Sequence, residues 1–316
     1  RMRCIAYRQR LNRSNDSSGN IDNLPTSIDI AGIGVKLGKG FSIFAGKQCT
    51  AYGGIEFDLN PIEIYEYSDM IENMSNFMTG LNIGYDINAH QQLNLQILDS
   101  RNGSFNKTYG VETEDGEQPA IESGKLPLVY TLNWNGNFND IFKTRWSASI
   151  MNEAKDKNLY YFAFGNELNL NKFNMFLDFM YSKEGIDRKG IMTGITGSME
   201  GHNAFDAGYF SMVTKLNYRF LPKWNAFVKG MYETASLTKQ QGDLEKGKYR
   251  TAWGYFAGVE FYPMDTNLHF FLTYVGRSYD FTARAKALGQ ENYSTNRVSV
   301  GFIYQLPLKN SRHRKH

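Results

Sequence analysis

The stretch Asn76–Asp86, NFMTGLNIGYD, alternates between two kinds of side chain. Every second position is apolar or β-branched, and the positions between them are mostly polar or small; the first set is Phe77, Thr79, Leu81, Ile83 and Tyr85. Successive residues of a β-strand point to opposite faces, so a period of two predicts a strand with one apolar face.

The same alternation recurs along the whole chain, for example in Phe210–Phe220 and in Arg297–Leu306. It predicts about fourteen strands, with boundaries uncertain by roughly two to four residues. The predicted strands span 2–12, 26–37, 41–49, 76–88, 91–100, 126–137, 142–153, 158–171, 174–185, 207–221, 224–237, 250–263, 267–281 and 294–308.

The connections between these strands alternate between short and long. The short ones are turns such as 38–40, 88–90 and 139–140. The long ones lie near 13–25, 50–75, 101–125, 186–206, 238–249 and 282–293. The connection 153–157 is short although its position in the alternation predicts a long one. Antiparallel strands with tight turns at one end and long loops at the other predict an all-β, up-and-down barrel.

The width of such a barrel decides which face is apolar. About fourteen strands enclose a lumen that side chains cannot fill, so we expect the apolar parity to face outward. Outward-facing apolar strands with aromatic residues near their ends are typical of barrels in a bacterial outer membrane. A soluble sandwich or propeller is the alternative, but we find no repeated blade motif of 40–50 residues.

Composition excludes several other classes of protein. The 316 residues contain 22 Phe, 20 Tyr and 30 Gly but no apolar run near the ~18 residues that a spanning helix needs. The formal net charge is only +3, and no basic run is interleaved with stacking aromatics. Nucleic acid is therefore not an expected partner.

We find no sequence motif for catalysis or for a cofactor. The chain lacks G-x-S-x-G, a P-loop, zinc-ligand spacing and a dinucleotide-binding G-x-G-x-x-G. A catalytic Ser/His/acid site that uses His202 or His269 remains an alternative, because such sites are recognised by their geometry and not by a sequence motif. The expectation is that the protein is not an enzyme, binds no metal and needs no cofactor.

Segment 50–75 is the most distinctive loop. It contains six acidic residues and no basic ones, yet it is rich in aromatic and branched residues, as expected for a loop that packs against something. The acidic residues are Glu56, Asp58, Glu63, Glu66, Asp69 and Glu72. The segment either folds into the lumen as a constriction, which we favour, or packs on the rim; a calcium site is a further alternative.

The polar parity of the strands should line the lumen. This places Arg145, Lys215, Arg219, Lys229, Arg277 and Arg297 there, together with Asp86, Glu167, Asp178, Glu233 and Glu260. Six basic side chains against five acidic ones predict a wet lumen with little net charge. Residues 1–308 then form one barrel domain, and 309–316 form a basic tail.

Several motifs, in this order along the chain, resemble outer-membrane porins of the phosphate-selective porin O and P family. They are Tyr7–Asn12, Phe44–Gln48, Tyr52–Glu56 with Pro61 and Tyr65, Leu132–Gly136 and Leu177–Met180. The resemblance implies a sixteen-stranded, homotrimeric barrel in the membrane of a Gram-negative bacterium, with a loop near a constriction. We accordingly expect one more hairpin before Arg1. The acidic segment and the mixed lumen depart from the arginine ladder and lysine cluster of phosphate-selective members.

The predicted function is passive diffusion of small hydrophilic solutes or ions across the outer membrane, with weak charge selectivity. An outer-membrane barrel lipase or protease and an adhesion or scaffold barrel are the alternatives. If segment 50–75 folds inward, its carboxylates should favour cations. If it stays at the rim, the basic wall residues should leave the pore unselective or mildly anion-preferring.

Overall fold

The computed structural model describes residues 2–11, 26–101, 103–111, 121–198, 201–264 and 268–304. These residues form one antiparallel sheet of fourteen strands that pair in chain order. The strands are β1 (Met2–Leu11), β2 (Thr26–Gly38), β3 (Phe41–Cys49), β4 (Phe77–Asn88), β5 (Gln91–Asp99), β6 (Leu128–Phe138), β7 (Phe142–Ala154), β8 (Lys157–Leu170), β9 (Phe173–Ile186), β10 (Phe205–Leu221), β11 (Trp224–Leu237), β12 (Gly247–Phe261), β13 (Leu268–Phe281) and β14 (Tyr293–Tyr304). The prediction of about fourteen antiparallel strands is confirmed.

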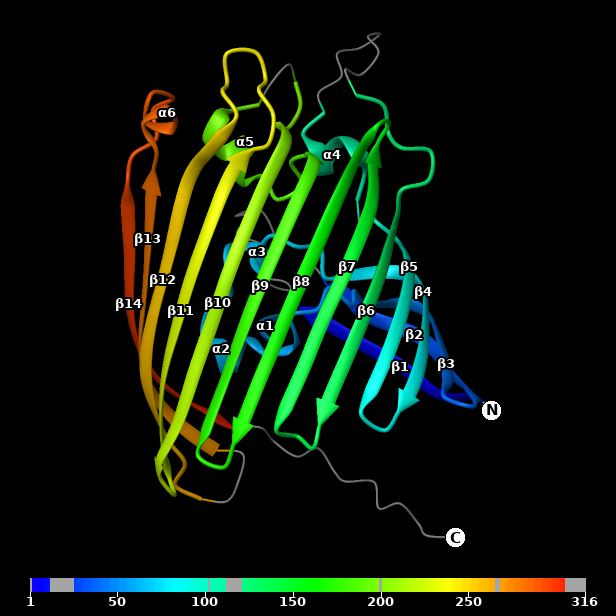
Figure 1. Ribbon diagram of the computed structural model, residues 1–316, viewed down its shortest axis with the longest axis vertical. Coiled ribbons are helices and arrows are strands. Elements are labelled where there is room, and N and C mark those ends of the chain that lie inside the picture. The colour runs from blue at the N-terminus through cyan, green and yellow to red at the C-terminus, as the bar shows by residue number, and fades with distance from the viewer. Residues whose placement is uncertain are drawn as a thin grey trace.

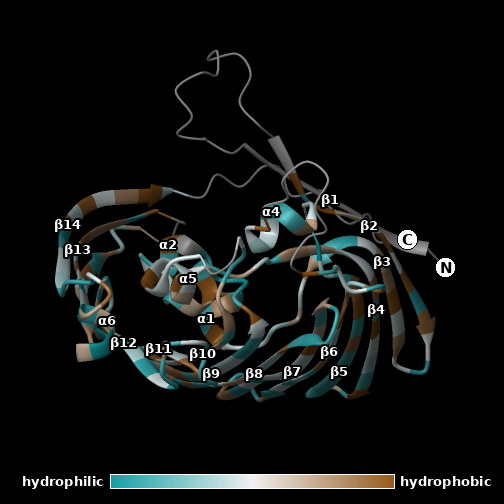
Figure 2. Ribbon diagram, turned by 90° about the horizontal axis from the view of Figure 1, so that it is seen from above, coloured by the Kyte–Doolittle hydropathy of each residue, from teal (hydrophilic) through white to brown (hydrophobic). Residues whose placement is uncertain are grey.

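The sheet curves around an interior, and its strands are tilted (Figures 1 and 2). The apolar parity lies on the convex face, where many large apolar side chains are exposed. Val228, Leu272 and Val300, for example, are 51%, 50% and 81% exposed. An apolar belt of this extent is expected where lipid, rather than water, covers the outer wall.

Short turns join the strands at one end, and the long connections lie at the other end, together with the short β7–β8 turn at 155–156 (Figure 1). The β6–β7 turn shows why such tight connections form. Asn139 and Asp140 both have positive φ, 56° and 57°, as a two-residue hairpin turn of the right twist requires. The predicted loop at 13–25, residues 102 and 112–120 of the predicted loop 101–125, and the tail 309–316 lie outside the described residues.

The described parts of the long connections hold six short helices. They are α1 (Ile55–Asp58), α2 (Pro61–Ile64), α3 (Asp69–Glu72), α4 (Phe105–Tyr109), α5 (Ile191–Thr196) and α6 (Ala283–Lys286). No helix in the described part of the chain is long and apolar enough to cross a membrane.

The buried core lies between segment 50–75 and the concave face of the sheet. Seen from above, α1 and α2 lie within the curve of the strands (Figure 2). Tyr52 and Ile55 of the segment are buried against wall residues such as Tyr161 and Phe227, and Met70 belongs to the same cluster. The interior is therefore packed on the β7–β12 side.

The two ends of the sheet are expected to lie on opposite sides of the membrane, with the long connections outside the cell. Ala287, just after α6, and Ala89, in the β4–β5 turn, are both exposed. In a background with Cys4 and Cys49 changed to serine, Ala287→Cys should react with a membrane-impermeant maleimide on intact cells, and Ala89→Cys should react only after lysis. The reverse pattern would invert this orientation.

Candidate functional site in the barrel interior

Segment 50–75 leaves the wall and returns to it at the same place. The backbone N–H of Thr50 donates to the carbonyl of Asn76 over 2.9 Å, and the N–H of Ala51 donates to Gln96 Oε1 over 2.7 Å. The residues between form a compact loop whose ends are tied together. The loop therefore extends into the interior from a fixed base on β3, β4 and β5.

Two glycines let the segment approach the wall closely. Gly53 and Gly54 have φ of 70° and 86°, and the Gly54 N–H donates to the Arg145 carbonyl over 3.0 Å. A Cβ on Gly53 would lie 2.9 Å from that carbonyl oxygen, and one on Gly165 would lie 2.7 Å from the Gly54 Cα. Side chains at these positions would push the loop off β7 and β8.

Two wall carboxylates hold the starts of the short helices. Asp178 on β9 accepts hydrogen bonds from the N–H groups of Ile55 and Glu56, over 2.9 and 2.7 Å. Glu233 on β11 accepts from the N–H groups of Asp69 and Met70, over 3.0 and 3.1 Å. Each carboxylate satisfies two donors that the first turn of a helix leaves unpaired.

A buried ion pair joins the segment to β11. Glu56 Oε1 lies 2.5 Å from Lys229 Nζ, and both side chains are 0% exposed. The second Glu56 oxygen accepts from Ser68 Oγ over 2.6 Å, while Lys229 also donates to the Glu66 carbonyl over 2.6 Å. The additional hydrogen bonds to Ser68 and to the Glu66 carbonyl offset part of the desolvation cost of burying both charges.

Arginines from β12, β13 and β14 hold the far end of the segment. Arg277 lies 2.8 Å from both Asp69 and Glu233, and Asp69 also pairs with Arg250. Glu66 is shared by Arg277 at 3.5 Å and Arg297 at 3.3 Å. The segment is thus anchored by wall groups of both signs.

Tyr65 lies at the turn between α2 and α3. Its φ is +65°, and its ring stacks on Phe227 with centroids 5.0 Å apart. The hydroxyl donates to Glu260 Oε1 over 2.7 Å, and Lys215 donates to the carbonyl of Glu63 beside it. Burial, followed by the negative charge of Glu260, raises the pKa of Tyr65 well above its usual value, so the hydroxyl stays a donor at neutral pH.

The predicted lumen residues fall into two groups. Arg145, Lys215, Lys229, Arg277, Arg297, Asp178, Glu233 and Glu260 contact the segment, with Arg145 Nε 2.8 Å from Asp58. For Arg219, Asp86 and Glu167 the described residues show no bond to the segment; they lie nearer the short turns. Most of the first group is buried under the segment, so these side chains hold the loop where the sequence predicted open lining.

Two anchors on the inward parity, Gln96 on β5 and Arg250 on β12, are absent from the predicted lumen lining. Arg250 lies on β12, an even number of residues from Glu260, and both face the interior. Gln96 carries no charge, and Arg250 lies at the first position of the predicted strand 250–263. The Gly53–Gly54 pair belongs to a motif that resembles porins, but its packing role depends on contacts with β7 and β8.

A further arginine joins the segment to the long connections. Arg188, just after β9, donates to the Tyr109 hydroxyl over 3.0 Å, to Ser75 Oγ over 3.2 Å and to the Ser100 carbonyl over 2.5 Å. Tyr109 belongs to α4, Ser75 ends segment 50–75, and Ser100 follows β5 directly. Arg188 therefore joins the β9–β10 connection to the β5–β6 and β3–β4 connections by hydrogen bonds.

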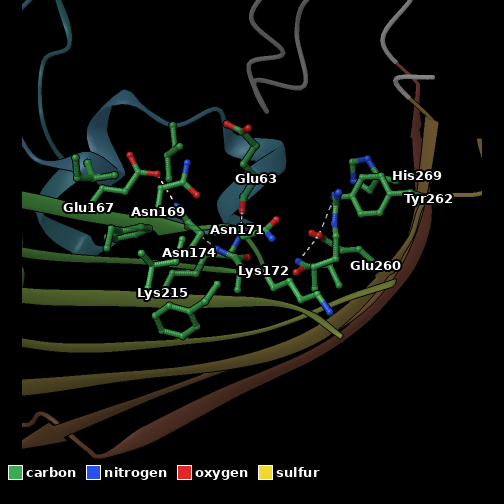
Figure 3. Close-up of a pocket in the computed structure, with 18 of the residues that line it drawn as sticks. Glu63, Glu167, Asn169, Asn171, Lys172, Asn174, Lys215, Glu260, Tyr262 and His269 are labelled. Carbon is green, nitrogen blue, oxygen red and sulfur yellow. Dashed lines mark hydrogen bonds between the residues drawn. The ribbon is translucent and has the colours of Figure 1, made fainter. Parts of the chain in front are cut away.

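Open space remains on both sides of the segment. A cavity of about 550 Å³ lies below α1 and α2, bounded by Glu63, Lys215, Glu260 and Tyr262 among others (Figure 3). Another of about 430 Å³ lies between the segment and β13–β14, next to Glu72 and Arg297. The segment thus narrows the interior without filling it.

Comparison with known protein families agrees with this architecture. The profile of the phosphate-selective porin O and P family matches residues 5–306, almost the entire chain. The chain belongs to the phosphate-selective porin O and P family. This porin is accordingly a protein of the bacterial outer membrane, and its family is one of passive diffusion channels.

Solved structures show the same fold at low sequence identity. The outer membrane channel DcaP of Acinetobacter baumannii has a TM-score of 0.57 at 11% identity, covering 90% of this porin and 76% of DcaP. OccAB3 of the same organism has a TM-score of 0.50 at 14% identity, covering 92% and 71%. OmpT of Vibrio cholerae, in its trimer form, has a TM-score of 0.50 at 11% identity, covering 83% and 73%. No curated protein sequence matches this porin.

Proposed function

We propose that the interior is a passive diffusion pore for small hydrophilic solutes or ions, with segment 50–75 as its constriction. The observation that carries this proposal is that the segment is anchored to strands from β5 to β14. The wall groups that hold it are an amide, carboxylates and basic side chains. A loop held so widely narrows the path permanently. Transport then follows the solute gradient and needs no chemical step.

The charge of the constriction is largely compensated. Glu56, Asp58, Glu66 and Asp69 all pair with wall bases. Glu63 borders the cavity below the segment and Glu72 borders the one beside β14, and neither has an ion pair among the described residues. These two carboxylates leave a weak preference for cations.

Removing the two unpaired carboxylates should remove that preference. A unit charge about 8 Å from a monovalent ion in water changes its occupancy by about a factor of two. We expect Glu63→Gln with Glu72→Gln to lower the cation-to-anion permeability ratio by roughly that factor per charge at 0.1 M salt. The wild-type preference should itself fade at 1 M, where the Debye length is about 3 Å.

Reversal potentials under a salt gradient measure this ratio. Glu291→Gln is the matched control, because Glu291 is exposed in the β13–β14 connection outside both cavities. A ratio that is equal in wild type and the double variant would show that other groups set the selectivity.

Planar-bilayer recording of the purified protein tests the pore itself. Discrete ohmic steps are expected; silence together with esterase or peptidase turnover would favour a barrel enzyme. We also propose a homotrimer, supported by the family and by the trimeric form of the similar OmpT. The mass of the detergent-solubilised protein distinguishes a trimer from a monomer.

A further inference from the structure

The cavity below segment 50–75 is unusually rich in carboxamide side chains. Ile55, Leu59 and Glu63 of segment 50–75 border it on the side of the long connections, and residues of the β8–β9 turn border it at the short-turn end. Figure 3 shows Glu63 together with Asn171 and Lys172 of that turn. Asparagines from four strands and that turn line it: Asn169, Asn171, Asn174, Asn217 and Asn225. A carboxamide is neutral and offers both donors and acceptors.

The same chemistry continues along the neighbouring wall. A cavity of about 470 Å³ at the turn ends of β4–β7 is lined by Asn88, Gln91, Gln92, Asn135 and Asn137, among others. Above it, Asn94 donates to Asn133 over 3.3 Å and to Gln92 over 3.1 Å. The short-turn end of the lumen is therefore lined by amides over much of its circumference.

Formal charges in the larger cavity cancel. Its lining contains Lys172, Lys215 and Arg219 against Glu63, Glu167 and Glu260. Most of these groups already have partners. Lys215 donates to a backbone carbonyl, Glu167 lies 3.4 Å from Lys143, and Glu260 accepts from Asn225 and Tyr262, each over 2.9 Å. The lining as a whole therefore attracts neither anions nor cations strongly, and the local effect of Glu63 is weak.

Aromatic rings complete the lining. Tyr262, Phe173 and Phe176 border the cavity, and Tyr262 lies 5.1 Å from the His269 ring and 5.4 Å from the Arg219 guanidinium. A neutral ligand with apolar C–H faces and many hydroxyl groups fits this mixture, because rings pack on its faces while amides and paired charges satisfy its hydroxyls.

We propose that this cavity binds a neutral polyhydroxylated solute of disaccharide size on its way through the lumen. The volume of about 550 Å³ lies within the roughly 300–1,000 Å³ typical of small-molecule sites. The inference rests on the proposed pore function and adds its substrate class. Since segment 50–75 borders the cavity on the side of the long connections, the site is reached more readily from the short-turn side.

Single-channel recording with sucrose tests the proposal. Sucrose added on the short-turn side should interrupt the ionic current in a saturable way and at lower concentration than from the other side. Polyethylene glycol of similar hydrodynamic size has ether oxygens but almost no hydroxyl groups, and it should only lower conductance in proportion to concentration.

Variants locate the site. Loss of one or two hydrogen bonds should raise the half-blocking sucrose concentration by roughly three- to tenfold in Asn217→Ala, and Tyr262→Leu should act in the same direction. Asn296→Ala is the matched control, because Asn296 pairs with Tyr274 on the outer face. Each variant is compared only when its unblocked conductance matches that of the wild type.

The outcomes separate the two proposals. An open channel in which sucrose and polyethylene glycol act alike, or in which Asn217→Ala and Tyr262→Leu block like the wild type, overturns the binding site and leaves the pore intact. Saturable block by inorganic phosphate but not by sucrose would also overturn it. Absence of any channel current overturns the pore function itself.

Discussion

Replacing Lys229 with methionine is expected to release segment 50–75 from the barrel wall and to raise single-channel conductance. The substitution leaves the Glu56 carboxylate, 0% exposed, without its cation at 2.5 Å. Removing one partner of a buried ion pair costs about 3–5 kcal/mol, because the remaining charge has lost both water and its counter-ion. The segment can recover that energy by moving Glu56 into the lumen.

Two measurements follow the release. The wider path should carry a larger and noisier current in planar bilayers. A Glu-specific protease should cut the released segment; trypsin is unsuitable because the segment contains no lysine or arginine. Lys286→Met on exposed α6 is the control for loss of a positive charge.

A double variant separates this mechanism from a general loss of stability. Glu56→Gln with Lys229→Met removes both charges, so conductance and protease resistance should return toward wild type. If Lys229→Met behaves like wild type in both assays, the pair does not anchor the segment. If the double variant is as damaged as the single one, lost side-chain packing is responsible instead.

Arginine on the outer wall is expected to destabilise the folded barrel by roughly 2–4 kcal/mol near mid-membrane. Leu216 and Val228 pair with each other in the register of β10 and β11, and both belong to the outward parity. They lie a few residues in from the short-turn end at Leu221 and Trp224, where a tilted strand that rises about 3.3 Å per residue has reached roughly the middle of an apolar band about 25 Å tall. Leu216→Arg and Val228→Arg should therefore give the full effect. Leu81→Arg on β4 tests the same face in another part of the sheet.

Depth should modulate this cost. Phe302 pairs with Phe270, and Phe270 pairs with Phe261, near the short-turn ends of their strands. Phe302→Arg should accordingly cost only about 0–1 kcal/mol, as at a membrane interface. Asn82→Arg and Asn217→Arg, on the inward parity, should fold and alter conductance.

Urea titration of barrels refolded in lipid vesicles measures these free energies. The inward variants serve as controls for introducing an arginine into a strand. Equal tolerance of arginine at Leu216 and at Asn217 would contradict the assignment of the outer face to lipid.

The strands could be predicted from the sequence because their pattern is local. The period of two in Asn76–Asp86 indicates both the strand and its apolar face, and the other strands show the same alternation in their own residues. The predicted boundaries agree with the structure to within a few residues; predicted 76–88, for example, is Phe77–Asn88. Short turns fix antiparallel neighbours, so strand order follows as well.

The interior site could be predicted only in part. Parity identified Lys229, Arg277 and Glu233 as inward-facing, because inward or outward is a property of a single strand. It could not reveal that these side chains are buried under segment 50–75. Exposure depends on which other part of the chain covers a residue.

The sequence by itself determined the barrel, the set of strand positions that faces lipid and the acidic character of segment 50–75, because each depends only on residues that are neighbours in sequence. Only the tertiary structure decided where that segment lies and which of its charges stay unpaired. Glu56 meets Lys229 across 173 positions of sequence, and Ile55 meets Asp178 across 123. Such pairs form when the curved sheet brings distant strands around one lumen, and no local pattern encodes which carboxylate each cation will reach.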